Sequence, residues 1–213
     1  MSEGTVPGFP LFPLGIVALP SEGVPLHIFE DRYRRMIEQC LHGAPGSLQR
    51  TFGILWLSEQ ELKPIGCACE VEQLVERMDD GRLDILVRGT RPFRLLERQD
   101  DHEFPAGIVE FLGEEAEDSN AEAAAGAREL YRDLVMQATD REIEDAELEQ
   151  MGAYRMAATV EFTVEAKQEL LELRSENARM RLLALLLKAA IDRLDLVERA
   201  QVRALSNGKV RFG

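Results

Sequence analysis

Residues 65–88 read IGCACEVEQLVERMDDGRLDILVR, and this stretch decides the class of fold. Apolar side chains recur at every second position on both sides of an Asp-Gly pair, a period that is typical of strands with one buried face. Because Asp-Gly suits a turn that needs a positive φ, the stretch predicts a long β-hairpin. Its buried face is expected to carry Ile65, Cys67, Cys69, Val71, Val75, Leu83, Ile85 and Val87.

Shorter apolar runs, separated by Gly and Pro, surround this hairpin and predict further strands. They cover residues 52–57, 93–96 and 108–112. The Pro-rich opening predicts a first strand, with Pro10 and Pro13 at positions that an edge strand tolerates. The apolar side chains that this first strand is expected to bury are Phe12, Leu14, Ile16 and Val17. Several strands around one core suggest a small, partly closed barrel.

One helix is expected inside this strand-rich half. Its apolar face has a period of 3.6 residues, with charged side chains on the opposite face. Gly43 is expected to end the helix in the left-handed conformation. The residues of the apolar face are Phe29, Tyr33, Met36, Ile37, Cys40 and Leu41.

The composition changes after Gly113, where an acidic segment leads into a region without proline that is rich in Ala, Leu, Glu and Arg. We therefore expect a β-rich subdomain over residues 1–113 and a helical subdomain over residues 114–213. Ser119 with Glu122 matches a capping box at the start of the first of these helices. The apolar face of that helix is expected to carry Ala127, Leu130, Tyr131, Leu134, Val135 and Ala138.

Three more helices are expected after this one. The second covers residues 148–162, Thr163 caps a third that runs to Leu173, and Ser175 caps a long last helix that runs to about Leu205. Between residues 182 and 191 only Lys188 is charged. This segment is therefore expected to be covered on several sides, with internal packing favoured over docking of a partner.

The net charge of −14 argues against nucleic-acid binding, which needs clustered basic side chains. No apolar stretch is long enough to span a bilayer, and the opening has no secretory signal pattern, so neither a membrane nor export is expected. Three cysteines without disulfide spacing fit a reducing compartment. Cytoplasm is the expected location.

No catalytic, cofactor or metal residue is assigned. Neither phosphate-binding glycine motif occurs, and Cys67 and Cys69 have no nearby histidine in the sequence and lie on the expected buried face. His27 is interpreted as a structural residue and Trp56 as a core residue. A Ser-Lys dyad would have to use one of the lysines in loop-like, helix-surface or terminal positions: Lys63, Lys167, Lys188 and Lys209.

Three groups of residues, read together, resemble the N-terminal substrate-recognition domain of Lon proteases. The first group is the opening FPLFPL (residues 9–14), Leu19-Pro20, PLHIFE (residues 25–30) and Arg32-Tyr33. The second is Phe52-Gly53, Ile65-Gly66, the hairpin through Asp80-Gly81 to Val87-Arg88-Gly89, Arg91 and Phe93. The third is KQELLE (residues 167–172) with Arg181-Leu182. The resemblance spans nearly the whole chain.

The resemblance implies an α+β fold, in which a PUA-like, partly closed β-barrel subdomain with one helix precedes a helical bundle with a long last helix. It also implies a free-standing, non-catalytic module, without ATPase or protease domains, that binds unfolded proteins or peptides. The hypothesis places the binding site in a groove between the β subdomain and the helices. A cellular Lon protease is a further partner that the resemblance leaves open. Two alternatives stand beside it: a peptidase-like hydrolase with a site assembled from separated residues, and an RNA-binding PUA-like protein.

Overall fold

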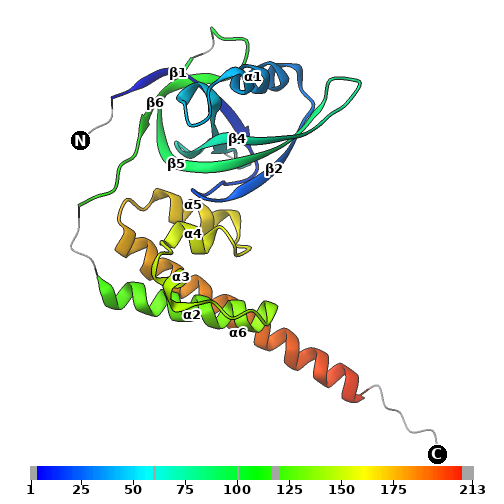
Figure 1. Cartoon of the computed structure of the whole chain (residues 1–213), viewed down its shortest axis with the longest axis vertical. Helices are drawn as coiled ribbons and strands as arrows, with labels where there is room; N and C mark the ends of the chain where they lie inside the picture. Colours follow the sequence, from blue (N-terminus) through cyan, green and yellow to red (C-terminus); the bar gives the residue numbers. More distant parts are fainter. Residues whose placement is uncertain (1–3, 60, 100, 117–119, 208–213) are drawn as a thin grey trace, which may run out of the picture. The chain divides into compact units, whose positions relative to one another are not determined.

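The structure is a computed structural model that describes residues 4–59, 61–99, 101–116 and 120–207, with the backbone alone for residues 198 and 201–207. The chain divides into two compact units (Figure 1). The first combines Met1–Ala116 with Tyr154–Glu176, and the second combines Glu117–Ala153 with Asn177–Gly213. The single boundary at residue 113 stays a prediction. None of the described helices is long and apolar enough to cross a membrane.

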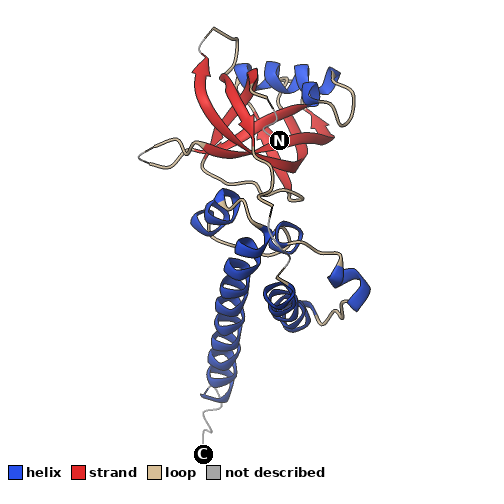
Figure 2. Cartoon of the chain, turned by 90° about the vertical axis from the view of Figure 1, so that its left-hand side faces the viewer, coloured by secondary structure: helices blue, strands red, loops and turns tan. Residues whose placement is uncertain are grey.

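Six strands form one sheet in the first unit: β1 (Val6–Leu14), β2 (Gly23–Ile28), β3 (Thr51–Trp56), β4 (Ile65–Arg77), β5 (Leu83–Gln99) and β6 (Ala106–Phe111). Their order is β2-β5-β4-β3-β1-β6, and β6 also pairs with β5. Among the strands of the described residues, β1 and β3 form the one parallel pair. The sheet is thus partly ringed without being a complete barrel, as Figure 2 shows in red. The expected α+β class, with a β-rich part and C-terminal helices, is confirmed.

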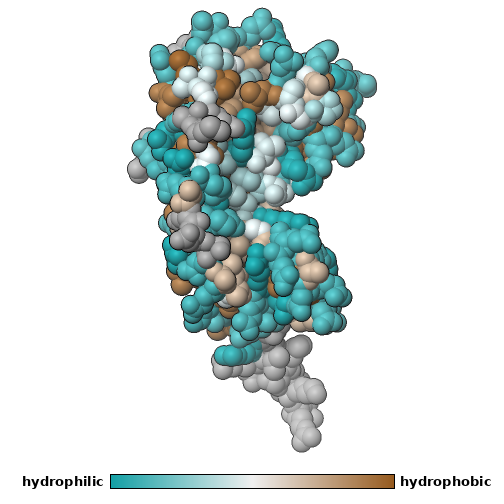
Figure 3. Space-filling view, turned by 60° about the vertical axis from the view of Figure 1, so that its left-hand side comes forward, coloured by the Kyte–Doolittle hydropathy of each residue, from teal (hydrophilic) through white to brown (hydrophobic). Residues whose placement is uncertain are grey.

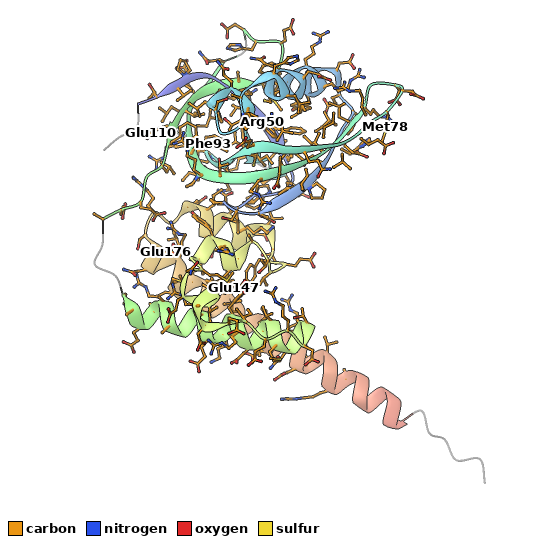
Figure 4. The ribbon with its side chains drawn as sticks, in the orientation of Figure 1. Arg50, Met78, Phe93, Glu110, Glu147 and Glu176 are labelled. Atoms are coloured by element: carbon orange, nitrogen blue, oxygen red, sulfur yellow. The ribbon has the colours of Figure 1, made fainter. Side chains whose placement is uncertain are left out.

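Phe93 lies at the centre of the core that the ring encloses (Figure 4). The ring of Phe9 meets Phe93 and Phe111 edge-on, with ring centroids 5.5 Å apart in both pairs. Phe93 also approaches the backbone of two neighbouring strands. A Cβ at Gly53 would lie 2.4 Å from the Phe93 ring, and one at Gly66 would lie 2.9 Å from that ring and 2.4 Å from the carbonyl oxygen of Ile54. These glycines are therefore required by close packing.

The expected hairpin joins β4 to β5. Gly81 takes a φ of +85°, and the turn closes with a 2.9 Å hydrogen bond from the Met78 N–H to the Arg82 carbonyl oxygen. Leu83, Ile85 and Val87 are buried, as the alternation predicts. Val75 is not: it is 60% exposed, and that part of the prediction is wrong. The β4–β5 pairing shifts register at several points, and the shift between Leu74 and Glu76 takes Val75 out of the alternation.

Helix α1 (Asp31–His42) packs against the sheet and buries Tyr33, Met36, Ile37 and Cys40. The expected buried face is wrong at Phe29, which precedes the helix and is 62% exposed. Gly43 ends the helix in an extended conformation, with φ −69°, so the expected left-handed cap is also wrong. A Cβ at Gly43 would lie 2.6 Å from the backbone nitrogen of Arg50, the last residue of the short helix η1 (Leu48–Arg50). Close packing of backbone, not a positive φ, accounts for this glycine.

Two other expectations for the strands need correction. Strand β1 ends at Leu14, and Ile16 beyond it is exposed at the surface, whereas Phe12 and Val17 are buried. Residues 93–96 do not form a separate strand, because they continue β5. The long β5 can pair with β2 and β4 along its first half and with β6 along its second half, which is what bends the sheet into a ring.

Helix α5 (Val164–Glu172) belongs to the same unit and begins where predicted, because the Thr163 side chain accepts a hydrogen bond from the Ala166 N–H. The Gln168 side-chain amide donates to the carbonyl oxygen of Ile65 at 3.1 Å. Lys167 forms an ion pair with Glu22, and the second carboxylate oxygen of Glu22 accepts from the Leu19 N–H at 2.9 Å. Since these two ionic side chains are only 16% and 14% exposed, α5 is fixed to the sheet by a largely buried pair.

The second unit contains α2 (Ala121–Thr139), α3 (Asp145–Glu149) and α6 (Glu176–Asn207). Asn120 caps α2 by accepting from the Ala123 N–H, whereas Ser119 of the expected capping box lies outside the described residues. The Asn120 N–H donates to the side-chain oxygen of Asn177 at 3.0 Å, which joins the starts of α2 and α6.

The helical half differs from expectation in two places. The single helix predicted over residues 148–162 is two short ones, α3 and α4 (Ala153–Ala157), separated by a break that includes Gly152. Helix α6 follows Ser175 as predicted, but it is not covered on several sides along residues 182–191. Leu183 and Leu187 are buried there, whereas Leu185 is 68% exposed.

Candidate functional site

The outer face of the sheet presents side chains from β2, β4 and β5 to solvent. Because Leu83, Ile85 and Val87 point into the core, Asp84, Leu86 and Arg88 point outward. Strand β2 lies beside β5 with Pro25 opposite Leu86 and His27 opposite Asp84. The side chains of β2 at residues 25 and 27, with residue 29 just beyond, therefore share this face.

Four apolar side chains on this face form what we call the outer patch: Pro25, Phe29, Val75 and Leu86. Phe29 and Val75 are each about three-fifths exposed, with values of 62% and 60%. Their exposure has a local cause in each case, since Phe29 lies in the link between β2 and α1 and Val75 lies at a register shift of β4. Grouped apolar side chains on a surface commonly mark an interaction site.

His27 holds the aromatic part of the patch in place. Its Nδ1 lies 2.6 Å from the Asp84 Oδ1, and its ring stacks on Phe29 with centroids 6.1 Å apart. The interpretation of His27 as a structural, hydrogen-bonded residue agrees with these contacts. The imidazole thus limits the orientations of an exposed phenylalanine, which lowers the entropy lost when a partner covers it.

The hairpin that carries Val75 is anchored to α1. Arg77 forms an ion pair with Glu38, and Arg34 donates to the Asp80 carbonyl oxygen at 2.9 Å. The hydrogen bond from Arg77 holds the pKa of Glu38 below its usual value. At the other end of the patch, Arg88 binds both carboxylate oxygens of Glu72, at 2.8 and 2.9 Å. The patch therefore lies on a braced surface bordered by charged pairs.

All three cysteines are free and buried. Burial raises the pKa of the Cys40 thiol to about 11. A hydrogen bond with Cys67, together with burial, raises the pKa of the Cys69 thiol well above its usual value. Since the thiolate is the reactive form, these side chains are suited to packing, as predicted for Cys67 and Cys69.

The other residues weighed for chemistry lie apart. Within residues 4–207, excluding the gaps and side chains not described, no group of three His, Cys, Asp or Glu side chains is placed to hold a metal ion. Lys63 pairs with Glu61 and Lys167 pairs with Glu22, while Lys188 is exposed on α6. Lys209 lies outside the described residues. The assignment of no catalytic, cofactor or metal residue stays a prediction.

The interpretation of Trp56 as a core residue is wrong. Its side chain is partly exposed at the end of β3. It lines a pocket of about 580 Å³, the Trp56 pocket, together with the loop that follows β3 and the first turn of α5. Sequence reasoning missed both this pocket and the outer patch. The one sequence signal for the outer patch is the large apolar side chain of Phe29 next to charged residues. Its match to the helical period instead predicts a place on the buried face of the helix.

The surface as a whole is mixed. On the face shown in Figure 3, apolar areas in brown gather mainly on the strand-rich unit, among hydrophilic areas in teal. This distribution fits a site on the first unit.

The comparisons with known proteins agree with the resemblance read from the sequence. The family model of the ATP-dependent protease La (LON) substrate-binding domain matches residues 8–189. A Lon N-terminal domain protein from Xanthomonas campestris shares the fold with a TM-score of 0.62 and 24% identity, covering 82% of this chain and 95% of its own. The N-terminal domain of a Mycobacterium avium complex Lon protease gives a TM-score of 0.65 and 19% identity, covering 87% of this chain and 98% of its own.

Proposed function

Since the chain belongs to the family of Lon protease substrate-binding domains, we propose that it is a non-catalytic recognition module, which binds exposed apolar segments of other proteins on the outer patch. The proposal has two parts. The first is the class of ligand, unfolded proteins or extended peptides, which rests on the family. The second is the location of the site, which rests on the structure.

The observation that supports the location is the exposure of Phe29, just beyond β2, and of Val75, at a register shift of β4, on one braced surface. Covering such a side chain with a partner removes apolar surface from water and contributes about 1 kcal/mol for each. Two or three such contacts contribute about 2–3 kcal/mol from this chain's side, and the apolar side chains of the client are buried in the same contacts, so a weak affinity, in about the millimolar range, is expected. Such affinities suit a module that samples many unfolded clients.

An extended client segment is expected to contact this surface through its side chains and not by adding a strand to the edge of β2. Strand β2 pairs only with β5 among the described strands, so its other edge is open. Pro25 in the middle of β2 has no backbone N–H, so the edge does not offer a continuous row of donors for an added strand. Alternate side chains of an extended client, spaced for one face, contact the patch instead.

The non-catalytic part of the proposal is supported by the state of the nucleophiles. The three thiols are buried, and burial disfavours the thiolates of Cys40 and Cys69. Lys63 and Lys167 are engaged by glutamates. The same proposal includes a cytoplasmic location, which suits three free thiols.

Fluorescence polarisation with a labelled apolar peptide and with a permanently unfolded model protein tests the proposal. The double variant Phe29→Ser/Val75→Ser is expected to weaken binding about tenfold, equal to roughly 1.4 kcal/mol. Leu96→Ser is the matched control, because Leu96 is 49% exposed on β5 but lies outside the patch. No binding by the wild-type chain up to about millimolar concentration would contradict the ligand class. Equal losses in the double variant and the control would contradict the location.

A further inference from the structure

The Trp56 pocket is separate from the outer patch and lies entirely within the first unit. Its walls are Gly15 after β1, the end of β3, residues 57–59, 61 and 63 of the loop that follows, and the first turn of α5. Its volume, about 580 Å³, falls in the range of ligand-binding pockets.

The loop that forms one wall is held by several hydrogen bonds. The Leu57 N–H donates to the Leu14 carbonyl oxygen at 2.7 Å, and the Lys63 N–H donates to the Trp56 carbonyl oxygen at 2.9 Å. The Ser58 hydroxyl accepts from the Glu61 N–H at 3.1 Å and donates to the Glu61 carbonyl oxygen at 2.9 Å. These hydrogen bonds hold Leu57, Ser58, Glu61 and Lys63 in place, which lowers the entropy lost when a ligand contacts them.

Part of the lining is apolar and accessible. The indole of Trp56 and the side chain of Val164 are partly exposed, and Leu57 is 50% exposed. An indole face next to aliphatic side chains can accommodate the stem of a long side chain and attract a cation at its end.

The rest of the lining is acidic. Three glutamates, Glu59, Glu61 and Glu165, surround the pocket, and Lys63 is its only basic lining residue. Lys63 is already paired with Glu61, which leaves the exposed carboxylates of Glu59 and Glu165 for a ligand. The positive end of the α5 dipole offsets a part of this charge, because Glu165 lies in the first turn. The balance is still negative, as is the whole chain at −14.

We propose that the Trp56 pocket binds an arginine side chain of an extended apolar segment of a client protein. The guanidinium lies between the indole of Trp56 and the carboxylates of Glu59 and Glu165, and the apolar neighbours of the arginine contact Leu57 and Val164. The occupant is identified by charge complementarity together with the aromatic and aliphatic lining, since guanidinium groups bind carboxylates and stack on aromatic rings. The inference rests on the proposed function only in taking a protein segment as the ligand; the pocket does not require the outer patch.

Trp56 reports directly on this pocket, because it is the only tryptophan in the chain. The full chain is titrated with two short labelled peptides that are identical except for one central residue, arginine in one and citrulline in the other. Citrulline keeps the size of arginine without its charge. The arginine peptide is expected to bind about tenfold more tightly, to change the Trp56 emission on saturation, and to lose its advantage at high salt.

Two variants of α5 locate the effect. Glu165→Gln removes a carboxylate of the pocket and is expected to weaken the arginine peptide about threefold to tenfold, with no change for the citrulline peptide. Glu169→Gln is the matched control, since Glu169 is exposed on the same helix but does not line the pocket. Circular dichroism of both variants verifies their folding.

Equal affinities for the two peptides, an unchanged Trp56 emission at saturation, or equal losses in Glu165→Gln and Glu169→Gln would each overturn the inference. The outer-patch variant Phe29→Ser/Val75→Ser separates it from the proposed function. If the arginine peptide shows no advantage while apolar clients still bind and still depend on Phe29 and Val75, only the inference on the pocket fails. If neither kind of ligand binds the wild-type chain, both fail.

Discussion

The inner and the outer face of β2, β4 and β5 both carry apolar side chains, yet they differ in what covers them. Leu83, Ile85 and Val87 on the inner face are at most 1% exposed, whereas Phe29 and Val75 of the outer patch are about three-fifths exposed. Buried side chains on one face of a strand contribute to stability, and exposed ones on the other face contribute little to it. Under the proposed function, one face of these strands provides stability and the opposite face provides recognition.

The largest expected difference in stability is between a phenylalanine of the core and a phenylalanine of the outer patch. Phe93→Ala empties the centre of the core, where Phe93 is fully buried, and is expected to lower the free energy of unfolding by about 3–5 kcal/mol. Phe29→Ala is expected to change it by less than about 0.5 kcal/mol, because Phe29 is 62% exposed. Urea denaturation followed by circular dichroism measures both. Similar losses in the two variants would remove the distinction between the faces.

The buried thiols predict a loss of stability in alkali. The folded chain raises the pKa of Cys40 from 9.0 to about 11. Below pH 9 the thiol keeps its proton in both states; between pH 9 and pH 11 the unfolded chain releases the proton and the folded chain does not. Stability therefore falls as pH rises through this window, by about 1.4 kcal/mol per pH unit from this group.

Cys40→Ala isolates this contribution. The variant is expected to lose stability less steeply between pH 9 and pH 11 than the wild-type chain, although it is less stable at neutral pH because of the cavity. Urea denaturation at a series of pH values compares the slopes. Parallel slopes would show that Cys40 ionises as readily in the folded chain as in the unfolded one.

Charged side chains extend the comparison between covered and exposed groups. Lys167→Met leaves Glu22 largely buried without its partner and is expected to cost about 2 kcal/mol of stability, part of which Glu22→Gln restores in the double variant. Lys188→Met on the exposed side of α6 is expected to cost almost nothing. Thermal unfolding of the wild-type chain, Lys167→Met, Glu22→Gln and the double variant measures the coupling between Lys167 and Glu22. Additive effects of the two substitutions would contradict a coupled pair.

The smallest expected change in peptide affinity comes from a comparison of two valines on opposite faces. Val75→Thr is expected to leave stability unchanged and to weaken binding of an apolar peptide about threefold, or roughly 0.7 kcal/mol. Val87→Thr places a hydroxyl in the core and is expected to cost about 1–3 kcal/mol of stability, with no effect on the affinity of the folded chain. Peptide binding and urea unfolding, measured on both variants, decide whether binding depends on Val75 and stability on Val87. A peptide affinity that falls in Val87→Thr but not in Val75→Thr would place the site elsewhere.

The regular parts of the fold could be predicted from local sequence. The alternation of Leu83, Ile85 and Val87 and the Asp-Gly turn indicated the hairpin, and Thr163 indicated the start of α5. These features depend on residues that are neighbours in the chain. The family could also be recognised, because its opening residues are contiguous.

The residues of the candidate site could not be predicted in the same way. Val75 was assigned to the core because an alternating pattern does not reveal a register shift, which is set by the pairing with β5. Phe29 matched the helical period, but the chain at Glu30 is extended, so the helix begins after it. Gly43 serves a contact with Arg50, and the exposure of Leu185 depends on which helices pack beside α6. In each case the deciding partner lies elsewhere in the structure.

Amide hydrogen–deuterium exchange of the full chain, with and without a saturating apolar peptide, tests the central claim most directly. If the outer patch is the recognition site, the peptide slows exchange in β2 and in the part of the hairpin that carries Val75 and Leu86, and exchange on the buried strand β3 stays unchanged. Saturation of the chain by the peptide without added protection in β2 or the hairpin would contradict the account.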